Sequence, residues 1–505
     1  MKKLTVWALL ATLVVAGSAF AGPRGINAEA TFLTGQPATT NNDDSCDIGV
    51  APAATLLLPY FEVSEDRTDE TTLFTITNVS QYPAIAHVVL WTDFSYPVID
   101  FNIYLTGYDV QSINLFDVIW LGVVAPASGS RTSAGTGTDI SEGPAFGNFN
   151  GVTDSWDVIE PGSNLDTTDC HRPNIPGQLP EFHRERMQTA FTEGTVAAVP
   201  GNPLFAGCND VGNEHVNAVG YATIDVVNFC GTGLPTDGIP YFTTEIRFDN
   251  ILIGDYQQVN SGLDFAQGNP MVHIRAIPEG TGNTQAVEPL GTNFDRTFYS
   301  RYQAPISVTP LIPRTLDRRQ PLPSLFAARW INGGTGEFQT SFKIWREGVV
   351  TGTACTGAER ASLNGQLLVT ETVVFDEDEN GEGVAGGEII VSPSVGTDDI
   401  ILPETSLTSI ADGDVFPQDI IDTEPAGWVY MNLDNGSSTL ASTEFATQNW
   451  VVVSMRAEGR YSVDFDAAWL GNGCTPREDV SEFSDGGVND VLPGPAADIT
   501  PDFIP

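Results

Sequence analysis

Apolar and polar residues alternate along several short runs of the chain. In the run 98–105, apolar side chains occupy every second position from Ile99 to Leu105. In the run 338–345, Phe338, Phe342 and Ile344 share one parity. Residues two apart lie on the same face of a strand, so one face packs on a core and the other meets water. This pattern is typical of antiparallel sheets.

The rest of the chain also favours strands over helices. It contains 50 glycines and 33 prolines, and these separate short runs rich in valine, isoleucine, threonine and aromatic residues. The clearest helix candidate runs from Pro180 to Phe191, with an apolar stripe at Phe182, Met187 and Phe191 and Gly194 just beyond. We therefore predict a mainly all-β chain with one short helix.

Segments of the first half resemble segments of the second half, in the same order. The pairs are 73–91 with 325–345, which share Leu-Phe, Asn and Trp, then 220–225 with 427–432, and 271–276 with 452–457. We interpret them as two tandem, duplicated, immunoglobulin-like antiparallel β-sandwich domains with long loop insertions. Chance similarity between amphipathic strands is the alternative interpretation.

Composition along the chain places the expected boundaries. We predict a signal peptide (1–21), a disordered N-terminal segment (22–43), a first sandwich (44–285) with an insertion near 130–215, a connector rich in arginine and aromatic residues (286–321), a second sandwich (322–476) and an acidic, proline-rich tail (477–505).

The expectation of export comes from the N-terminus. A short positive region, Met1-Lys2-Lys3, precedes the apolar run 4–15 and the small-x-small sequence Ala19-Phe20-Ala21. The run is shorter than the roughly 20 apolar residues that a membrane-spanning helix needs. We expect cleavage and a mature chain in the periplasm, at the cell surface or outside the cell, with no membrane span. An uncleaved anchor is the alternative.

The net charge of the chain limits which molecules can bind to it. The formal net charge is −43, and Lys343 is the only lysine after residue 21. A surface this acidic repels nucleic acid, which we therefore do not expect as a partner. A saline or calcium-rich setting and simple solubility both explain such a composition.

The cysteines suggest stabilising bridges. An even number of cysteines in an exported protein indicates disulfides, and no C-x-x-C pair is present. We expect Cys355 to pair with Cys474 and the other four to pair among themselves, with free thiols as the alternative. The candidates are Cys46, Cys170, Cys208, Cys230, Cys355 and Cys474.

An acidic segment after the apolar run 373–375 resembles the first half of a calcium-binding loop. Side chains with oxygen atoms occupy alternate positions, and a hard cation needs several such oxygen ligands. A glycine at the sixth position allows the sharp turn of the loop. The closing acid comes one residue late, and an acidic hairpin tip turning at Asn380-Gly381 explains the same residues. The candidate ligands are Asp376, Asp378, Asn380, Glu382 and Glu388.

Arginines gather in the connector. Between residues 296 and 329, Asp317 is the only acid, and aromatic residues are interleaved. Such a cluster can bind acidic polymers or sugars, or it can dock on an acidic face of another copy. We favour a third interpretation, in which the arginines pair with acids of both flanking domains and fix their orientation. The members are Arg296, Arg301, Arg314, Arg318, Arg319 and Arg329.

Catalytic motifs find no support in the sequence. The five histidines lack metal-ligand spacing, and neither H-E-x-x-H nor G-x-S-x-G occurs. His87 lies in an alternating run and is expected to pack within a sheet. We nominate no catalytic residue and no cofactor other than the candidate calcium ion.

Two functional hypotheses follow. The leading one is a secreted or cell-surface, non-enzymatic structural or binding protein that self-associates as a homo-oligomer or surface polymer. The alternative is an extracellular protein that binds or degrades polysaccharide, for which exposed aromatic residues on one sheet face would be the sign.

Overall fold

A computed structural model gives the fold of the chain. It describes residues 49–123, 138–142, 179, 181–198, 207–228, 233–238, 240–276, 297–302, 317, 319–333, 337–348, 367–368, 371–383, 401–433, 447–457 and 461–470. The expected signal peptide, N-terminal segment and acidic tail lie outside these residues, as does most of the expected insertion near 130–215.

The first half forms two antiparallel sheets, called A and B from here on. Sheet A has the order β5-β2-β8-β9, with β2 Glu70–Asn78, β5 Val110–Asn114, β8 Leu252–Asn260 and β9 Phe265–Pro270. Sheet B has the order β10-β1-β7-β3-β4-β6, with β1 Thr55–Val63, β3 Ala84–Thr92, β4 Pro97–Leu105, β6 Thr138–Glu142, β7 Ala218–Val227 and β10 Val272–Ile274.

The second half forms antiparallel sheets C and D. Sheet C has the order β17-β12-β19-β20, with β12 Gln339–Arg346, β17 Thr405–Ser409, β19 Asn449–Ala457 and β20 Tyr461–Asp466. Sheet D has the order β15-β14-β18-β11-β21, with β11 Leu325–Ile331, β14 Glu371–Asp376, β15 Gly381–Gly383, β18 Ala426–Asn432 and β21 Ala468–Leu470. Strands β13 Leu367–Leu368 and β16 Ile401–Leu402 pair separately. The chain is therefore mainly β, as the alternating runs predict.

Helices are few and short in the described part of the chain. Helix α5, Glu181–Thr192, lies where the sequence predicts it and buries Met187 and Phe191 against the core between sheets A and B. The pattern gave no sign of the shorter elements. These are α4 Leu115–Ile119, α6 Gln418–Ile421, the 3₁₀ turns η1 Pro235–Asp237 and η4 Ser300–Tyr302, and the π-helical turn η2 Tyr241–Glu245.

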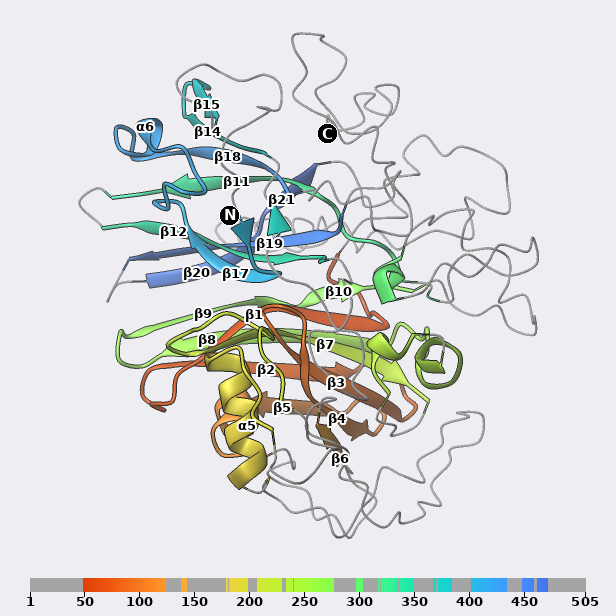
Figure 1. Ribbon diagram of the computed structural model, residues 1–505. Helices are drawn as coiled ribbons and strands as arrows, with labels where there is room; N and C mark the ends of the chain where they lie inside the picture. The colour runs from red at the N-terminus through yellow and green to blue at the C-terminus, as the bar shows by residue number, and fades with distance from the viewer. Residues whose placement is uncertain are drawn as a thin grey trace, which may run out of the picture.

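Among the described residues, three hydrophobic cores lie between the four sheets, and a smaller cluster around Leu325, Val373 and Tyr430 lies on the outer face of sheet D. Along β1 and β3, Leu56 and Val88 point into the core between A and B, whereas Leu57 and Val89 point into a second core. Sheet C completes that second core with Trp345 of β12 and with residues of β19. The opposite face of sheet C packs on sheet D in a third core. Figure 1 shows sheets C and D above sheets A and B.

This layering changes one part of the sequence prediction. The apolar face of β4 is buried as expected, but its polar face is buried as well, including Asp100 and Asn102. On the second face of β12, Gln339 is exposed, but Lys343 is fully covered. The expectation that these faces meet water was wrong for β4 and for the later part of β12, because sheets B and C are each covered on both sides there.

The strand orders of the two halves agree. The order β10-β1-β7-β3-β4 in sheet B corresponds to β21-β11-β18-β14-β15 in sheet D, and β5-β2-β8-β9 in sheet A corresponds to β17-β12-β19-β20 in sheet C. Corresponding strands follow the same sequence order. The register agrees as well, because Thr55 pairs with Asp225 in the first half and Leu325 pairs with Asn432 in the second.

Only one of the three segment matches seen in the sequence falls on corresponding strands. Segments 220–225 and 427–432 lie on β7 and β18, which correspond. The Leu-Phe pairs lie on β2 and β11, and the third match joins β10 to β19, which do not correspond. Those two matches are wrong as structural equivalents, because amphipathic strands share one pattern wherever they lie in a sandwich.

Candidate functional site

The connector places two arginines between the halves of the molecule. Residues 297–302, together with Asp317 and Arg319, border the core between sheets B and C, where Phe298, Tyr299 and Tyr302 contribute their rings. The side chain of Arg301 is 4% exposed and that of Arg319 is fully buried. The buried polar groups around these two arginines are called the seam below.

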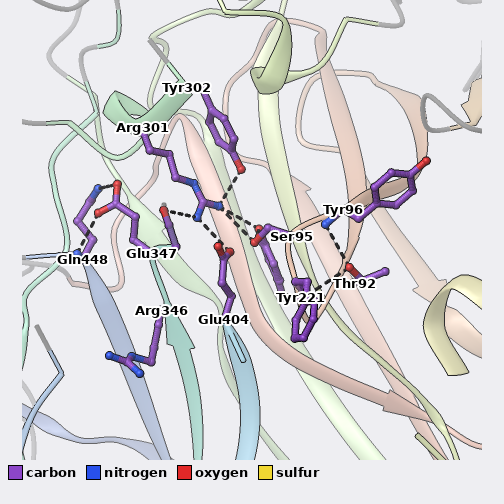
Figure 2. A network of polar contacts seen from close by, with 12 residues as sticks. Thr92, Ser95, Tyr96, Tyr221, Arg301, Tyr302, Arg346, Glu347, Glu404 and Gln448 are labelled. Atoms are coloured by element: carbon purple, nitrogen blue, oxygen red, sulfur yellow. Dashed lines mark hydrogen bonds and ion pairs between the residues drawn. The ribbon is translucent and has the colours of Figure 1, made fainter. Parts of the chain in front are cut away.

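Arg301 joins the second half of the chain to the first. Its Nη1 lies 3.0 Å from Oε2 of Glu404, which precedes β17. Its Nη2 donates to the Tyr302 hydroxyl at 2.7 Å and to the Tyr221 hydroxyl at 3.1 Å, and lies 3.5 Å from Oγ of Ser95. Figure 2 shows the guanidinium group between Glu404 and these hydroxyls. One side chain therefore bridges both sandwiches.

Aromatic rings surround this guanidinium group. Its carbon lies 4.7 Å from the ring centre of Tyr302 and 5.8 Å from that of Trp345. The rings of Trp91 and Tyr221 stack with centres 5.9 Å apart, and Trp91 also stacks on Tyr302 at 6.1 Å. A cation between aromatic faces is stabilised by their negative charge density, which partly offsets its lost hydration.

Burial sets the protonation of this group of residues. It raises the pKa of the Glu404 carboxyl to about 7, although Arg301 acts in the opposite direction. Burial alone would lower the pKa of Arg301, but Glu404 and the two tyrosines hold it above the ordinary value. Burial also raises the pKa of Tyr302 to about 12. The arginine stays charged, and the tyrosine hydroxyls that accept its hydrogen bonds stay neutral.

Arg319 forms a second centre around Asp225 of β7. Its Nη1 lies 2.9 Å from Asp317 and its Nη2 lies 3.5 Å from Asp225. Tyr241 and Tyr299 donate to Oδ2 of Asp225 at 2.7 Å and 2.8 Å. Burial, followed by the nearby Asp225 charge, raises the pKa of both tyrosines well above the ordinary value. The buried carboxylate is therefore held by neutral donors and one cation.

An amide clamp completes the seam. Nε2 of Gln448 donates to Glu347 at 3.0 Å and to the carbonyl oxygens of Thr297 and Phe298, both at 3.2 Å. Its Oε1 accepts from the backbone N–H of Leu322 at 3.0 Å. Figure 2 shows this pair beside the Arg301 centre. The connector is thus fixed along its backbone as well as through its arginines.

The other predicted arginines lie elsewhere. Arg329 is exposed on sheet D, and its Nη2 lies 2.5 Å from Glu377. Arg296, Arg314 and Arg318 lie outside the described residues. The contacts of Arg301 and Arg319 are of the kind that the interdomain interpretation expects, because both guanidinium groups point inward and neither is available to another copy.

The candidate calcium ligands lie at the tip of the β14–β15 hairpin. Both carboxylate oxygens of Asp376 accept hydrogen bonds from the turn, namely from the backbone N–H of Asp378 and Asn380, at 2.8 Å each, and from the Asn380 amide at 2.6 Å. The Asn380 amide, with these backbone donors, lowers the pKa of Asp376. A hairpin is present as in the alternative interpretation, but the turn lies at residues 377–379 rather than at Asn380-Gly381, because Gly381 already pairs with Phe375.

The remaining ligand positions add no cluster. Glu382 lies on β15, and Glu388 is outside the described residues. Among the residues that the structure describes, no group of three or more His, Cys, Asp or Glu side chains is placed to hold a metal ion. The calcium site stays a prediction from sequence.

The cysteine predictions fall mostly outside the described residues. Cys208 is buried in the core between sheets A and B. Cys46, Cys170, Cys230, Cys355 and Cys474 are not described. The expected pairing therefore stays a prediction.

The histidines that are described pack within the fold. His87 is buried as expected, with Nδ1 2.9 Å from Oδ1 of Asn102. Nε2 of His215 lies 3.0 Å from Oδ2 of Asp93, a contact that no sequence pattern predicted because 122 positions separate the two residues. Glu404 was missed for the same reason, whereas the gathering of arginines did point to Arg301 and Arg319.

Comparison of the chain with family models, with curated proteins and with solved structures finds no match in any of the three. In the described ranges, no helix is long and apolar enough to cross a membrane.

Proposed function

We propose that this chain is an exported, non-enzymatic, self-associating structural protein whose two sandwiches act as one rigid block outside the inner membrane. The N-terminal pattern of residues 1–21 supports export. The acidic surface supports solubility in that setting and disfavours nucleic acid as a partner.

The observation that carries this proposal is the seam. Arg301 is buried between the halves and pairs with Glu404 of the second, whereas Arg319 fixes the connector to Asp225 of the first. Interfaces between domains are usually small and polar and permit motion. Here a shared aromatic core and the buried Arg301–Glu404 pair favour a fixed orientation. A block that keeps its shape suits a load-bearing or spacing role.

The fold proposal is two tandem copies of an immunoglobulin-like sandwich. Its support is the agreement of strand order and register between the halves. Gly220 and Gly427 add to it, because they begin corresponding segments and each lies under an aromatic ring, Phe61 and Trp330 respectively. Duplication with a common packing constraint explains why glycine occupies both positions.

Cell fractionation and particle size test the structural role. Antibody against the chain should detect it outside the inner membrane, shortened by the predicted leader. Light scattering of the purified mature protein, coupled to size-exclusion chromatography, should show species larger than one chain. A full-length cytoplasmic chain, or a strict monomer at every concentration tested, contradicts the proposal.

The outer face of sheet D, where Phe375 and Trp428 are half-buried, supports a second candidate function, the binding of polysaccharide. The rings of Phe375 and Trp428 stack with centres 3.8 Å apart and planes 4° apart. They belong to the face of sheet D turned away from the third core, which Val374 and Val429 enter. The exposed pair Arg329–Glu377 lies on the same strands or next to them. Flat rings beside charged groups are suited to sugar rings.

Substitution of one of the two stacked rings tests polysaccharide binding. The change Trp428→Ala should abolish any retention of the protein on insoluble or soluble polysaccharides. Tyr108→Ala is the matched control, because Tyr108 is an aromatic residue that is 70% exposed at a distant loop. Equal retention of the two variants, or no retention of the wild-type chain on any glycan, removes the second candidate.

A further inference from the structure

The only lysine after residue 21 is buried against a carboxylate. Nζ of Lys343 lies 2.5 Å from Oδ2 of Asp464, and neither side chain is exposed to solvent. When both charged groups of an ion pair are removed from water, both lose much hydration energy, so fully buried ion pairs are uncommon. Burial of Lys343 and Asp464 as an ion pair is therefore costly.

The register of sheet C brings the two groups together. Lys343 on β12 pairs with Val452 of β19, and Asp464 on β20 pairs with Ser454, two residues along the same strand. Positions two apart share a face, so the lysine crosses β19 diagonally to reach the carboxyl. Oγ of Ser454 donates to the other oxygen, Oδ1 of Asp464, at 2.6 Å. The carboxyl is thus held with one oxygen toward the amine.

The first sandwich covers this site. Nζ of Lys343 lies 5.5 Å from the ring centre of Tyr256 on β8. Strand β9 lies along β20, where Asn269 donates to Asp466 at 2.7 Å and Ser462 donates to the Ala266 carbonyl at 2.6 Å. The amine and the carboxyl consequently meet in a closed space bounded by both halves of the molecule.

Burial favours the reactive, neutral form of the Lys343 amine. Burial lowers the pKa of Lys343, although Asp464, Glu70 and Glu62 oppose the shift. A neutral amine is the nucleophilic form. Burial raises the pKa of the nearby Glu70 to about 7, so this carboxyl can carry a proton near neutral pH.

We propose that Lys343 and Asp464 condense into an intramolecular isopeptide bond that covalently ties β12 to β20. The neutral amine attacks Cγ of the protonated Asp464 carboxyl, so the Nζ–Cγ bond forms. The Cγ–O bond to the carboxyl hydroxyl breaks, and this hydroxyl leaves with one amine proton as water. No electrons are gained or lost, and no other reactant is required.

Proximity and burial favour this reaction. Two groups fixed in contact react as if at very high concentration, since the entropy of bringing them together has been lost on folding. The product amide is neutral, so it removes the cost of keeping two charges in a closed space. The inference goes beyond the proposed structural role and stands without it, because it rests on this site alone.

The bond would close a long loop. Lys343 and Asp464 are 121 positions apart, and the link spans the middle strand β19. The last strands of the second sandwich would then stay attached to β12 even when hydrogen bonds break. A cross-link of this kind acts on the unfolded chain as a disulfide does, but it is insensitive to reductants.

Mass spectrometry of the exported, processed chain tests the proposal. The intact mass should be lower than that of the processed sequence by one water molecule, after correction for any disulfides. Proteolysis after reduction should release a branched peptide that joins the segments around residues 343 and 464. Lys343→Arg, which keeps the positive charge but lacks the amine, should have the full mass and yield only linear peptides.

The variant Asp464→Asn gives a second, independent readout. Its side-chain amide can be attacked in the same way with loss of ammonia, so its branched peptide should have the same mass as the wild-type one. Linear peptides around both positions in the wild-type digest, with the full intact mass, overturn the proposal. This result decides the matter even if a variant fails to fold, because it needs only the wild-type chain.

Discussion

The guanidinium group of Arg301 lies 3.0 Å from the carboxylate of Glu404, although 103 positions separate the two residues in the chain. The contact joins the connector to the second sandwich, while the same guanidinium group reaches the Tyr221 hydroxyl in the first. A single buried cation thus links three parts of the molecule.

The first prediction concerns the loss of this cation. Arg301→Met leaves the Glu404 carboxyl buried without its partner, and breaking a buried pair in this way costs about 3–5 kcal/mol. We expect the free energy of unfolding, measured by urea denaturation, to fall by an amount of that order.

Arg329→Met is the matched control for the first prediction. Arg329 also pairs with a glutamate, but its side chain is 60% exposed, and exposed pairs contribute under about 1 kcal/mol. Equal effects of the two substitutions would show that the seam does not stabilise the fold as described.

The second prediction concerns the close approach of strands at Gly427. A Cβ atom at this position would lie 1.9 Å from the Phe375 carbonyl oxygen, and one at Gly220 would lie 2.1 Å from the Trp91 carbonyl oxygen. Backbone atoms cannot move aside without disturbing the sheet, so either change to alanine should cost at least about 1–3 kcal/mol. Thermal melting measures both.

Gly413→Ala serves as the control for these two glycines. There the nearest atom is a flexible Gln418 side-chain carbon at 3.4 Å, which can shift. Because Gly220 and Gly427 occupy corresponding places, the duplication proposal expects similar losses at both. A large loss at one position and none at the other would argue against a shared packing constraint.

The third prediction concerns acid. Burial lowers the pKa of His273 to about 4, from an ordinary value of 6.5. The ring accepts a hydrogen bond from the Gly254 N–H at 3.0 Å through Nε2, as a neutral imidazole does. Between these two pKa values the unfolded chain binds more protons than the folded one, so the contribution of His273 is present above pH 6.5 and is lost as pH falls toward 4.

The loss of folding stability on acidification can be estimated from the change in the pKa of His273. A difference of 2.5 pKa units corresponds to roughly 3 kcal/mol. Stability should therefore be compared between the wild-type chain and His273→Gln across this pH range, so that other titrating groups cancel. The advantage of the wild-type chain should shrink on acidification, and parallel curves would refute the assignment.

The sequence predicted the strands and their apolar faces better than the burial of the polar side chains. Alternation identified β4 and β12 and the faces that enter a core, because side-chain parity is a local property of a strand. It failed for Lys343, since a polar residue on the second face looks the same whether it meets water or a buried carboxylate. Nothing local distinguishes the two cases.

The candidate site shows the same limit. Arginines and aromatic residues in the connector pointed to Arg301 and Arg319, because an isolated basic stretch in an acidic chain needs partners. Their acidic partners carried no signal, since Glu404 and Asp225 are two of 65 acidic residues and are brought near only by the fold. Long-range pairing of this kind depends on topology rather than on spacing.

The central claim is that the seam makes the two sandwiches one rigid unit, and calorimetry of the mature wild-type protein tests it most directly. A chain whose halves share a core and buried ion pairs should unfold in one transition, with the calorimetric enthalpy equal to the van't Hoff enthalpy. Two resolved transitions, each with the enthalpy of one sandwich, would contradict the account.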